Sequence, residues 1–196
     1  GAYPELSVDP VAIASQLVVN LQQIVSREIP PSTPAVVTIG KIHGGTAYNI
    51  IPDVVELEGT VRALDQKVRE YIANRIEEIA KGVTSGMRAK CEYEYVFGYP
   101  PLVNDEEFTK GFVESAKKVL DEGKIIEIQK PLMGGEDMAY FLQEAPGTFF
   151  FLCNPRAVDG EFHPHHNSKF DIDEDHLKTG AAVMLQATID WLENNS

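Results

Sequence analysis

Apolar residues recur every three or four positions along residues 10–25, which predicts an amphipathic helix. Asp9 precedes this stretch as a candidate N-cap, and Pro10 suits the first helical position. A second helix is predicted from about residue 66, with Asp65 as its cap. Its apolar stripe comprises Val68, Ile72, Ile76, Ile79 and Val83. Each helix therefore has one face to bury against a core.

Between the two helices, strands are predicted at residues 35–42 and at residues 54–63. In residues 54–63 apolar and polar side chains alternate one by one, as they do in half-buried strands, and residues 88–98 show the same alternation after the second helix. Residues 8–98 are thus predicted to run helix, strand, strand, helix, strand. One strand before the first helix would complete a split βαβ sandwich with two helices on one face. The sequence does not contain that strand.

A domain boundary is predicted at Pro100 and Pro101, which interrupt the third strand. Asn104 is a candidate cap for the next helix, with Glu107 at the capping-box position. Beyond it, predicted helices and strands alternate, which is typical of an α/β layer. The predicted helices cover residues 105–121, 136–144 and 174–194, and the predicted strands cover residues 124–129 and 147–152. Two strands are too few for an independent α/β domain.

Composition narrows the classes of partner. The 196 residues carry a formal net charge of −13, which argues against binding of nucleic acid or of an anionic membrane. There is no run of about 18 apolar residues and no basic-then-apolar leader, so we expect a cytoplasmic protein without a membrane span. Cys91 and Cys153 lie in apolar, strand-like contexts, and we expect both to be reduced and buried.

Four of the five histidines lie in residues 161–176, namely His163, His165, His166 and His176. Neutral imidazole is a common ligand of zinc-like metals. A catalytic metal needs about three protein ligands, however, and the HExxH and CxxC spacings are absent. Taken alone, the stretch favours a polar loop before a helix capped by Asp173 over a metal site.

Two glycine-containing loops are candidate substrate sites. In MGGED (residues 133–137), the glycines permit a tight turn with exposed backbone N–H groups, but taken alone the stretch favours a capped short helix without a substrate role. In HGGTAYNIIPD (residues 43–53), Asn49 is either a ligand or an ordinary turn residue. Arg62 lies on the polar face of its strand, where a surface ion pair is its default role. No GxSxG elbow, P-loop or GxGxxG is present.

Five motifs in order carry a resemblance that covers essentially the whole chain. They are AYPELSVDPVAIASQLVVNLQQIVSRE, GGTAYNIIPDVVELEGTVRALD, GYPPLVND, MGGEDMAYF and HHNSKFDIDEDHLKTGA. Together they resemble the aminoacylase/hippurate-hydrolase family of dinuclear metal-dependent amidohydrolases and carboxypeptidases, which includes the indole-acetyl-amino-acid hydrolases.

The resemblance implies a two-domain organisation. Residues 1–98 correspond to a ferredoxin-like βαββαβ lid, here lacking its first strand, which usually forms the dimer. Residues 99–196 correspond to the C-terminal α/β portion of the catalytic domain. The implied partners are a second copy of the chain, bound through the lid, and a small-molecule substrate, either an N-acyl amino acid or a small peptide whose amide bond is hydrolysed.

The resemblance also implies roles for individual residues. His166 matches a metal ligand, whereas the other three histidines of its stretch do not. Asn49 matches a lid asparagine that helps to bind substrate, and Arg62 matches a lid arginine associated with the substrate carboxylate. The remaining matches are Gly134, Gly135 and Glu136, which form a loop bordering the site.

The departures from the family pattern concern catalysis. The other metal ligands and the glutamate that acts as general base belong to an N-terminal half and do not occur in this sequence. The full-length enzyme is expected to hold two divalent metal ions. Zinc is the expected metal, and manganese, cobalt and nickel are the alternatives. This chain is expected to be a fragment that is inactive alone. The alternative is a non-enzymatic dimerisation module or a small-molecule-binding α/β module.

Overall fold

The computed structural model describes residues 1–195. The chain forms two compact units. Unit 1 comprises residues 1–101 and 131–136, and unit 2 comprises residues 102–130 and the residues from 137 onward. Helices and strands are both present, so the predicted mixed α/β class is confirmed. No helix in residues 1–195 combines the length and the apolar character needed to cross a membrane.

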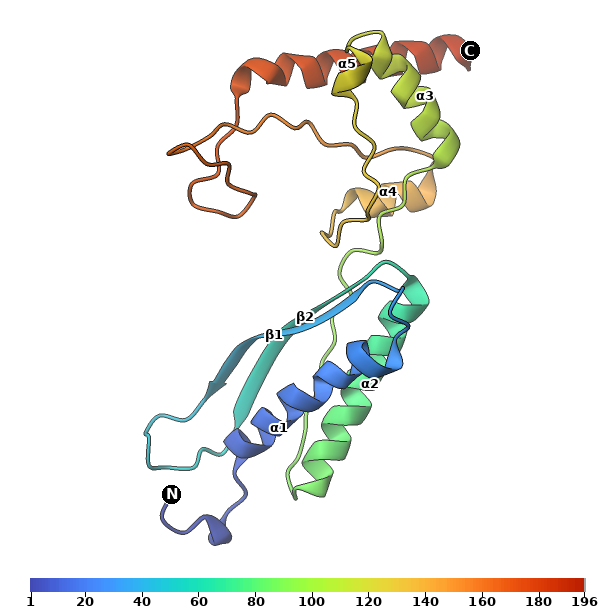
Figure 1. Cartoon of the computed structure of the whole chain (residues 1–196). Coiled ribbons are helices and arrows are strands. Elements are labelled where there is room, and N and C mark those ends of the chain that lie inside the picture. Colours follow the sequence, from blue (N-terminus) through green and yellow to red (C-terminus); the bar gives the residue numbers. More distant parts are fainter. Residues whose placement is uncertain (196) are drawn as a thin grey trace. The chain divides into compact units, whose positions relative to one another are not determined.

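Unit 1 is a β-hairpin with two helices on one side (Figure 1). The helices lie side by side, and their apolar stripes meet each other and the inward face of the hairpin. The elements in chain order are η1 (Pro4–Leu6), α1 (Pro10–Gln23), the π-helical turn η2 (Ile24–Glu28), β1 (Ala35–Gly44), β2 (Val55–Ala63) and α2 (Gln66–Gly86).

Both predicted caps of these helices are confirmed. The Asp9 carboxylate accepts hydrogen bonds from the backbone N–H groups of Val11 and Ala12, at 2.9 and 3.3 Å. The Asp65 carboxylate accepts one from the N–H of Val68 at 3.0 Å. These bonds satisfy N–H groups that the first turn of a helix cannot pair internally.

The core of unit 1 is built around Ile24 and Ile72, which are both 0% exposed. Ile24 comes from the turn after α1, and Ile72 comes from the predicted stripe of α2. The inward residues of β2, among them Leu57 and Val61, pack against this cluster. Glu56, Glu58, Thr60 and Arg62 are exposed, as the alternating pattern predicted, whereas Gly59, predicted on the inward face, is exposed as well.

The β1–β2 pairing is antiparallel and contains one irregularity, between Ile39 and Lys41. Gly59 pairs with Ile39 at this point. A Cβ atom at residue 59 would lie 2.5 Å from the carbonyl oxygen of Thr38 and 2.9 Å from the Ile39 side chain. The close approach of the two backbones therefore requires glycine at this position.

The prediction of a third strand at residues 88–98 is wrong. Burial does alternate as predicted, since Cys91, Tyr93 and Tyr95 are half-buried while their neighbours are exposed. The Tyr93 hydroxyl donates to the carbonyl of Ala73 on α2 at 2.8 Å. In the described structure, however, residues 90–97 make no backbone–backbone hydrogen bonds. Side-chain alternation sets which face is buried, but a strand also requires a neighbouring backbone to pair with.

Unit 2 is mainly helical, and α3 and α5 pack against each other (Figure 1). The three predicted helices are present, but the first ends at Lys117 rather than at residue 121. The elements are α3 (Glu106–Lys117), η3 (Glu122–Lys124), α4 (Met138–Glu144), η4 (Glu174–His176) and α5 (Leu177–Asn194).

The predicted strands at residues 124–129 and 147–152 are wrong for the same reason as the third strand. Across the described residues the one sheet is the β1–β2 pair, and unit 2 has isolated bridges instead. Asn104 was also misassigned as a cap, because Asp105 caps α3 by accepting from the N–H of Phe108 at 2.7 Å. The Asn104 side chain instead bonds both backbone groups of Phe149, at 2.8 and 2.9 Å, and so takes the place of a strand partner.

The packing of α3 against α5 includes a nearly buried carboxylate, Asp190, which is 8% exposed. The Lys118 ammonium and the Gln186 amide each donate to it at 2.8 Å. The hydrogen bond from Lys118 is the largest cause that lowers the pKa of Asp190 to about 2. This carboxylate therefore stays charged and ties the end of α3 to the middle of α5.

Both cysteines are free thiols, but the prediction that both are buried is wrong for Cys153, which is exposed. Cys91 is half-buried, and burial raises the pKa of its thiol. Cys153 follows a stretch predicted as a core strand. Because that stretch is not part of a sheet, nothing covers both of its faces in the described structure.

Glu28 joins the end of η2 to α2 through a two-pronged ion pair. Its carboxylate accepts from Nε and Nη2 of Arg75, at 2.8 and 2.9 Å, and from the Tyr71 hydroxyl at 2.9 Å. The Glu28 side chain is 15% exposed. The hydrogen bonds from Arg75 are the main cause that lowers the pKa of Glu28 from 4.5 to about 2.

This shift predicts acid sensitivity for unit 1. The folded-state pKa lies below the unfolded value, so the stabilisation is fully present above pH 4.5 and is lost as the pH falls towards 2. Replacing Glu28 with Gln is expected to flatten the dependence of the unfolding free energy on pH in this range. Urea denaturation followed by circular dichroism between pH 6 and 2 measures this dependence.

The control is Glu78→Gln, because Glu78 is a 62% exposed partner of the same arginine. Equal slopes of unfolding free energy against pH for Glu28→Gln and for the wild type would contradict the prediction.

Candidate functional site

The histidine-rich segment lies in the long loop between α4 and η4 of unit 2. Hydrogen bonds close the base of this loop, from Arg156 N–H to the Asp171 carbonyl at 3.1 Å and from Asp173 N–H to the Asn154 carbonyl at 2.8 Å. Farther along, the Lys169 ammonium contacts the Asp159 carboxylate at 2.9 Å. The loop is therefore tied across its width at several points.

His166 occupies a left-handed backbone conformation in this loop, with φ at 67°. The turn that contains it is closed by a hydrogen bond from Asn167 N–H to the Pro164 carbonyl at 3.2 Å. A non-glycine residue pays a conformational cost in this region, and such residues occur frequently at functional sites. His166 thus combines an exposed side chain with a backbone conformation that few non-glycine residues adopt.

The four histidines differ in their surroundings. The His165 ring packs edge-on against Phe170, with centroids 4.8 Å apart, and His176 Nε2 lies 3.7 Å from the Asp173 carboxylate. His163 is half-buried, and its Nε2 has no hydrogen-bond partner among the described residues. His166 is exposed and has no side-chain partner in the described structure. Of the four, it is the imidazole that is both accessible and uncommitted.

A complete metal site is not assembled by these residues. In the described part of the chain, no group of three or more His, Cys, Asp or Glu side chains lies close enough to hold a metal ion. His166 supplies one imidazole donor, whereas a complete zinc-like site has three or four protein ligands.

The candidate substrate residue Asn49 lies in the exposed loop between β1 and β2. The N-terminal segment packs against this loop, since a Cβ atom on Gly1 would lie 2.5 Å from the Asn49 carbonyl oxygen. The neighbouring Tyr48 is fully exposed. Asn49 is thus accessible at the tip of the hairpin.

Arg62 lies near the other end of the hairpin, opposite Val36. Its Nη1 donates to the Thr60 hydroxyl at 2.5 Å and to the Val61 carbonyl at 2.9 Å. Among the described residues it forms no ion pair, so the default assignment of a surface salt bridge is wrong. The ion pair on this hairpin joins Lys41 and Glu58 instead. The Arg62 guanidinium is exposed and retains donors for an anion.

Asn49 and Arg62 are not brought together within one chain. The last pair at the tip of the hairpin is Gly44–Val55, and Arg62 lies seven positions farther along β2. At the usual rise of a strand the two residues are roughly 20 Å apart. A single amino acid cannot contact both of them on the same hairpin.

The glycine loop belongs to unit 1. Gly135 lies against Tyr99, whose ring carbon Cδ2 is 3.6 Å from the position of a Cβ atom on residue 135. A Cβ on Gly134 would meet nothing within 4 Å. The helix that follows begins at Met138, so Glu136 lies in the loop and not in the first helical turn as predicted. The structure therefore places Asn49, Arg62 and the glycine loop in unit 1, and His166 in unit 2.

Comparison with known proteins identifies the family. Residues 4–190 match the peptidase family M20/M25/M40, and the chain belongs to this family. It is 37% identical over 182 residues to thermostable carboxypeptidase 1 of Saccharolobus solfataricus, covering 92% of this chain and 45% of that protein. It is 40% identical over 185 residues to the N-acetyldiaminopimelate deacetylase of Bacillus pumilus, covering 93% and 47%.

A solved structure supports the same conclusion. The YxeP protein of Bacillus subtilis, described as a dinuclear metal-binding peptidase of the M20 family, superposes with a TM-score of 0.75 at 28% identity. The match covers 96% of this chain and 47% of that one. The chain thus spans about half the length of the relatives it matches, and these relatives are hydrolases. The family resemblance stated from the motifs is confirmed.

Proposed function

We propose that this chain is the lid and the C-terminal catalytic portion of a metal-dependent amidohydrolase or carboxypeptidase. The full-length protein would hydrolyse the amide bond of an N-acyl amino acid or of a small peptide. In this assignment residues 1–98 form the lid and dimerise with a second copy, and residues 99–196 belong to the catalytic domain. Membership of the peptidase family and the hydrolase relatives support the reaction class.

The observation that carries the proposal is the state of His166. It is the residue that the family motif matches to a metal ligand, and it is exposed, unpartnered among the described residues and held in a left-handed turn. A divalent ion, zinc or alternatively manganese, cobalt or nickel, would supply Lewis-acid polarisation of the scissile carbonyl. His166 would contribute one imidazole ligand, while the turn fixes the backbone from which the ring extends.

The other candidate residues would bind and orient the substrate. The Arg62 guanidinium, which is free of carboxylate partners, would hold the substrate carboxylate. The Asn49 amide would bind at a separate place, because the hairpin keeps the two apart. Gly134, Gly135 and Glu136 would border the site, with backbone N–H groups available for hydrogen bonding. The chain alone is expected to be inactive, since it supplies a single metal ligand and no general base.

Metal analysis combined with an activity assay tests the proposal. The 196-residue chain and its full-length parent are dialysed against zinc, manganese, cobalt or nickel, analysed for bound metal, and assayed with N-benzoylglycine. The proposal predicts a loaded, active parent and an empty, inactive fragment. Two metals bound per fragment, or hydrolysis by the fragment, would show that the site is misplaced. A parent that neither binds metal nor hydrolyses the substrate would favour the non-enzymatic binding module.

The separation of Asn49 and Arg62 predicts additive effects. In the full-length protein, Asn49→Ala and Arg62→Ala are each expected to lower kcat/KM, mainly through KM. Their coupling free energy is expected to stay below about 0.5 kcal/mol, as for residues with no shared neighbours. A double-mutant cycle of kcat/KM values measures it. Strong coupling would mean that the two residues meet on one substrate by pairing of two chains.

A further inference from the structure

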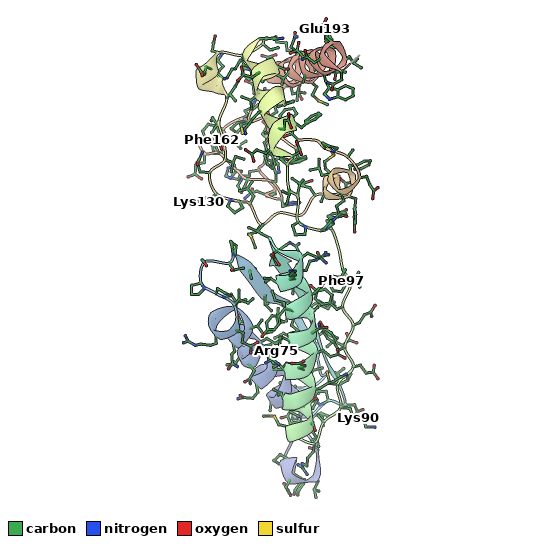
Figure 2. All side chains as sticks on the ribbon, turned by 90° about the vertical axis from the view of Figure 1, so that its right-hand side faces the viewer. Arg75, Lys90, Phe97, Lys130, Phe162 and Glu193 are labelled. Carbon is green, nitrogen blue, oxygen red and sulfur yellow. The ribbon has the colours of Figure 1, made fainter. Side chains whose placement is uncertain are left out.

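Arg69, in the first turns of α2, has a guanidinium that contacts a side-chain amide, a backbone carbonyl and an aromatic ring. Its Nη1 donates to Gln66 Oε1 at 3.1 Å, and its Nη2 donates to the backbone carbonyl of Gly98. The guanidinium also lies over the Phe97 ring, 5.0 Å from its centroid. Figure 2 shows Phe97 beside the upper, N-terminal end of α2. Arg69 therefore holds residues 97 and 98 against the helix by a hydrogen bond and a cation–π contact.

The contacts continue from this point to the glycine loop. The Phe97 ring also packs against Tyr95, with centroids 4.7 Å apart, so the aromatic ring is held from a second side. Directly after Gly98, the Tyr99 ring lies against Gly135. A continuous path within unit 1 thus leads from Arg69 through residues 97–99 to the loop that contains Gly134, Gly135 and Glu136.

The identity of the side chain matters for this path. A planar guanidinium can lie on an aromatic ring and donate in its own plane to two acceptors at the same time, whereas a lysine ammonium cannot satisfy all three. The sequence contains no signal for this role, because Arg69 and Gly98 are 29 residues apart and Arg69 looks like an ordinary solvated helix residue. The contact exists only through folding.

We propose that Arg69 is a positioning residue, which holds segment 97–99 and, through Tyr99, keeps the glycine loop in place to border the substrate. The inference rests on the proposed function, since the loop matters for catalysis only if it borders the site. Arg69 itself does not touch the N-acyl amino acid substrate. Its effect is on the geometry of the loop that does.

The first test is kinetic and uses the full-length protein with N-benzoylglycine. Arg69→Met is expected to raise KM about five- to tenfold while kcat changes less than about twofold, because a displaced loop weakens substrate binding. Arg69→Lys is expected to give an intermediate KM, since it keeps the cation without the planar fork. Arg27→Met is the matched control, because Arg27 is exposed and its side chain has no partner among the described residues. An unchanged KM in Arg69→Met, with an unmoved loop, overturns the inference.

The second test reads the loop directly through the backbone amide NMR chemical shifts of residues 132–136. Arg69→Met is expected to shift these signals, because the loop is displaced, whereas Arg27→Met leaves them unchanged. Phe97→Leu removes the aromatic support without touching the charge, and it is expected to shift the same signals. This variant keeps the test available if Arg69→Met fails to fold. Unchanged chemical shifts in both variants overturn the inference, even if KM rises.

The outcomes also separate this inference from the proposed function. If Arg69→Met displaces the loop but leaves KM unaltered, the loop has no substrate role and that part of the proposed function fails. The positioning contact then stands as a structural finding.

Discussion

Replacing His166 with Ala in the full-length protein is expected to lower kcat/KM by more than about 100-fold and to reduce the metal bound per chain. The physical reason is the loss of an imidazole that is exposed, unpartnered in the described structure and presented by a tied loop. In residues 1–195, no group of three or more His, Cys, Asp or Glu side chains forms a second metal site that would compensate for its loss. Elemental analysis of the dialysed protein and an N-benzoylglycine assay measure both effects.

Two further variants keep this experiment specific. His166→Asn retains a residue that tolerates the left-handed conformation with φ of 67°, so it removes the ligand with little disturbance of the turn. It is expected to lose metal and activity as His166→Ala does. His176→Ala, at an exposed residue that contacts Asp173, is the control and is expected to keep both. Normal metal content and activity in both His166 variants would remove His166 from the site.

Replacing Ile72 with Ala is expected to destabilise unit 1 by about 3 kcal/mol. Ile72 is fully buried on α2 at the centre of the cluster that joins both helices to the hairpin. Truncation removes buried methyl groups and leaves a cavity that the surrounding residues fill only in part. Urea denaturation of the 196-residue chain, followed by circular dichroism, measures the change in the free energy of unfolding.

The same helices supply graded controls. Ile72→Val removes a single methyl group and is expected to cost about 1 kcal/mol. Val19→Ala, at a position of α1 that is 68% exposed, is expected to change stability by less than about 0.5 kcal/mol. A cost below about 1 kcal/mol for Ile72→Ala would mean that this core is not packed as described.

The sequence predicted best where the determining interactions are local. The helices of unit 1 follow from a 3.6-residue apolar period and from the caps Asp9 and Asp65, whose hydrogen bonds reach only two or three residues along the chain. The two strands of the hairpin lie where the sequence predicted strands, although β1 extends two residues farther, to Gly44. Motif order also sufficed to identify the family, which the match over residues 4–190 confirms.

Prediction of the remaining strands failed because pairing is not local. Residues 88–98 have the side-chain alternation of a strand, and Cys91, Tyr93 and Tyr95 of the predicted face are half-buried, yet in the described structure residues 90–97 form no backbone–backbone hydrogen bonds. In unit 2, residues 147–152 were predicted to form a strand. The N–H and the carbonyl of Phe149 bond to the Asn104 side chain instead of to a neighbouring strand. Alternation is a property of one segment, whereas a sheet is a property of two.

The sequence by itself thus determined the helices, the positions of the two hairpin strands, the family and the candidate residues, because each depends on neighbours in the chain or on the order of motifs. Only the tertiary structure decided that Asn49 and Arg62 lie at opposite ends of one hairpin, that His166 is the accessible, uncommitted histidine of its loop, and that Arg69 reaches Gly98. These facts depend on strand register, on burial and on contacts across 29 residues, which arise when distant segments pack together.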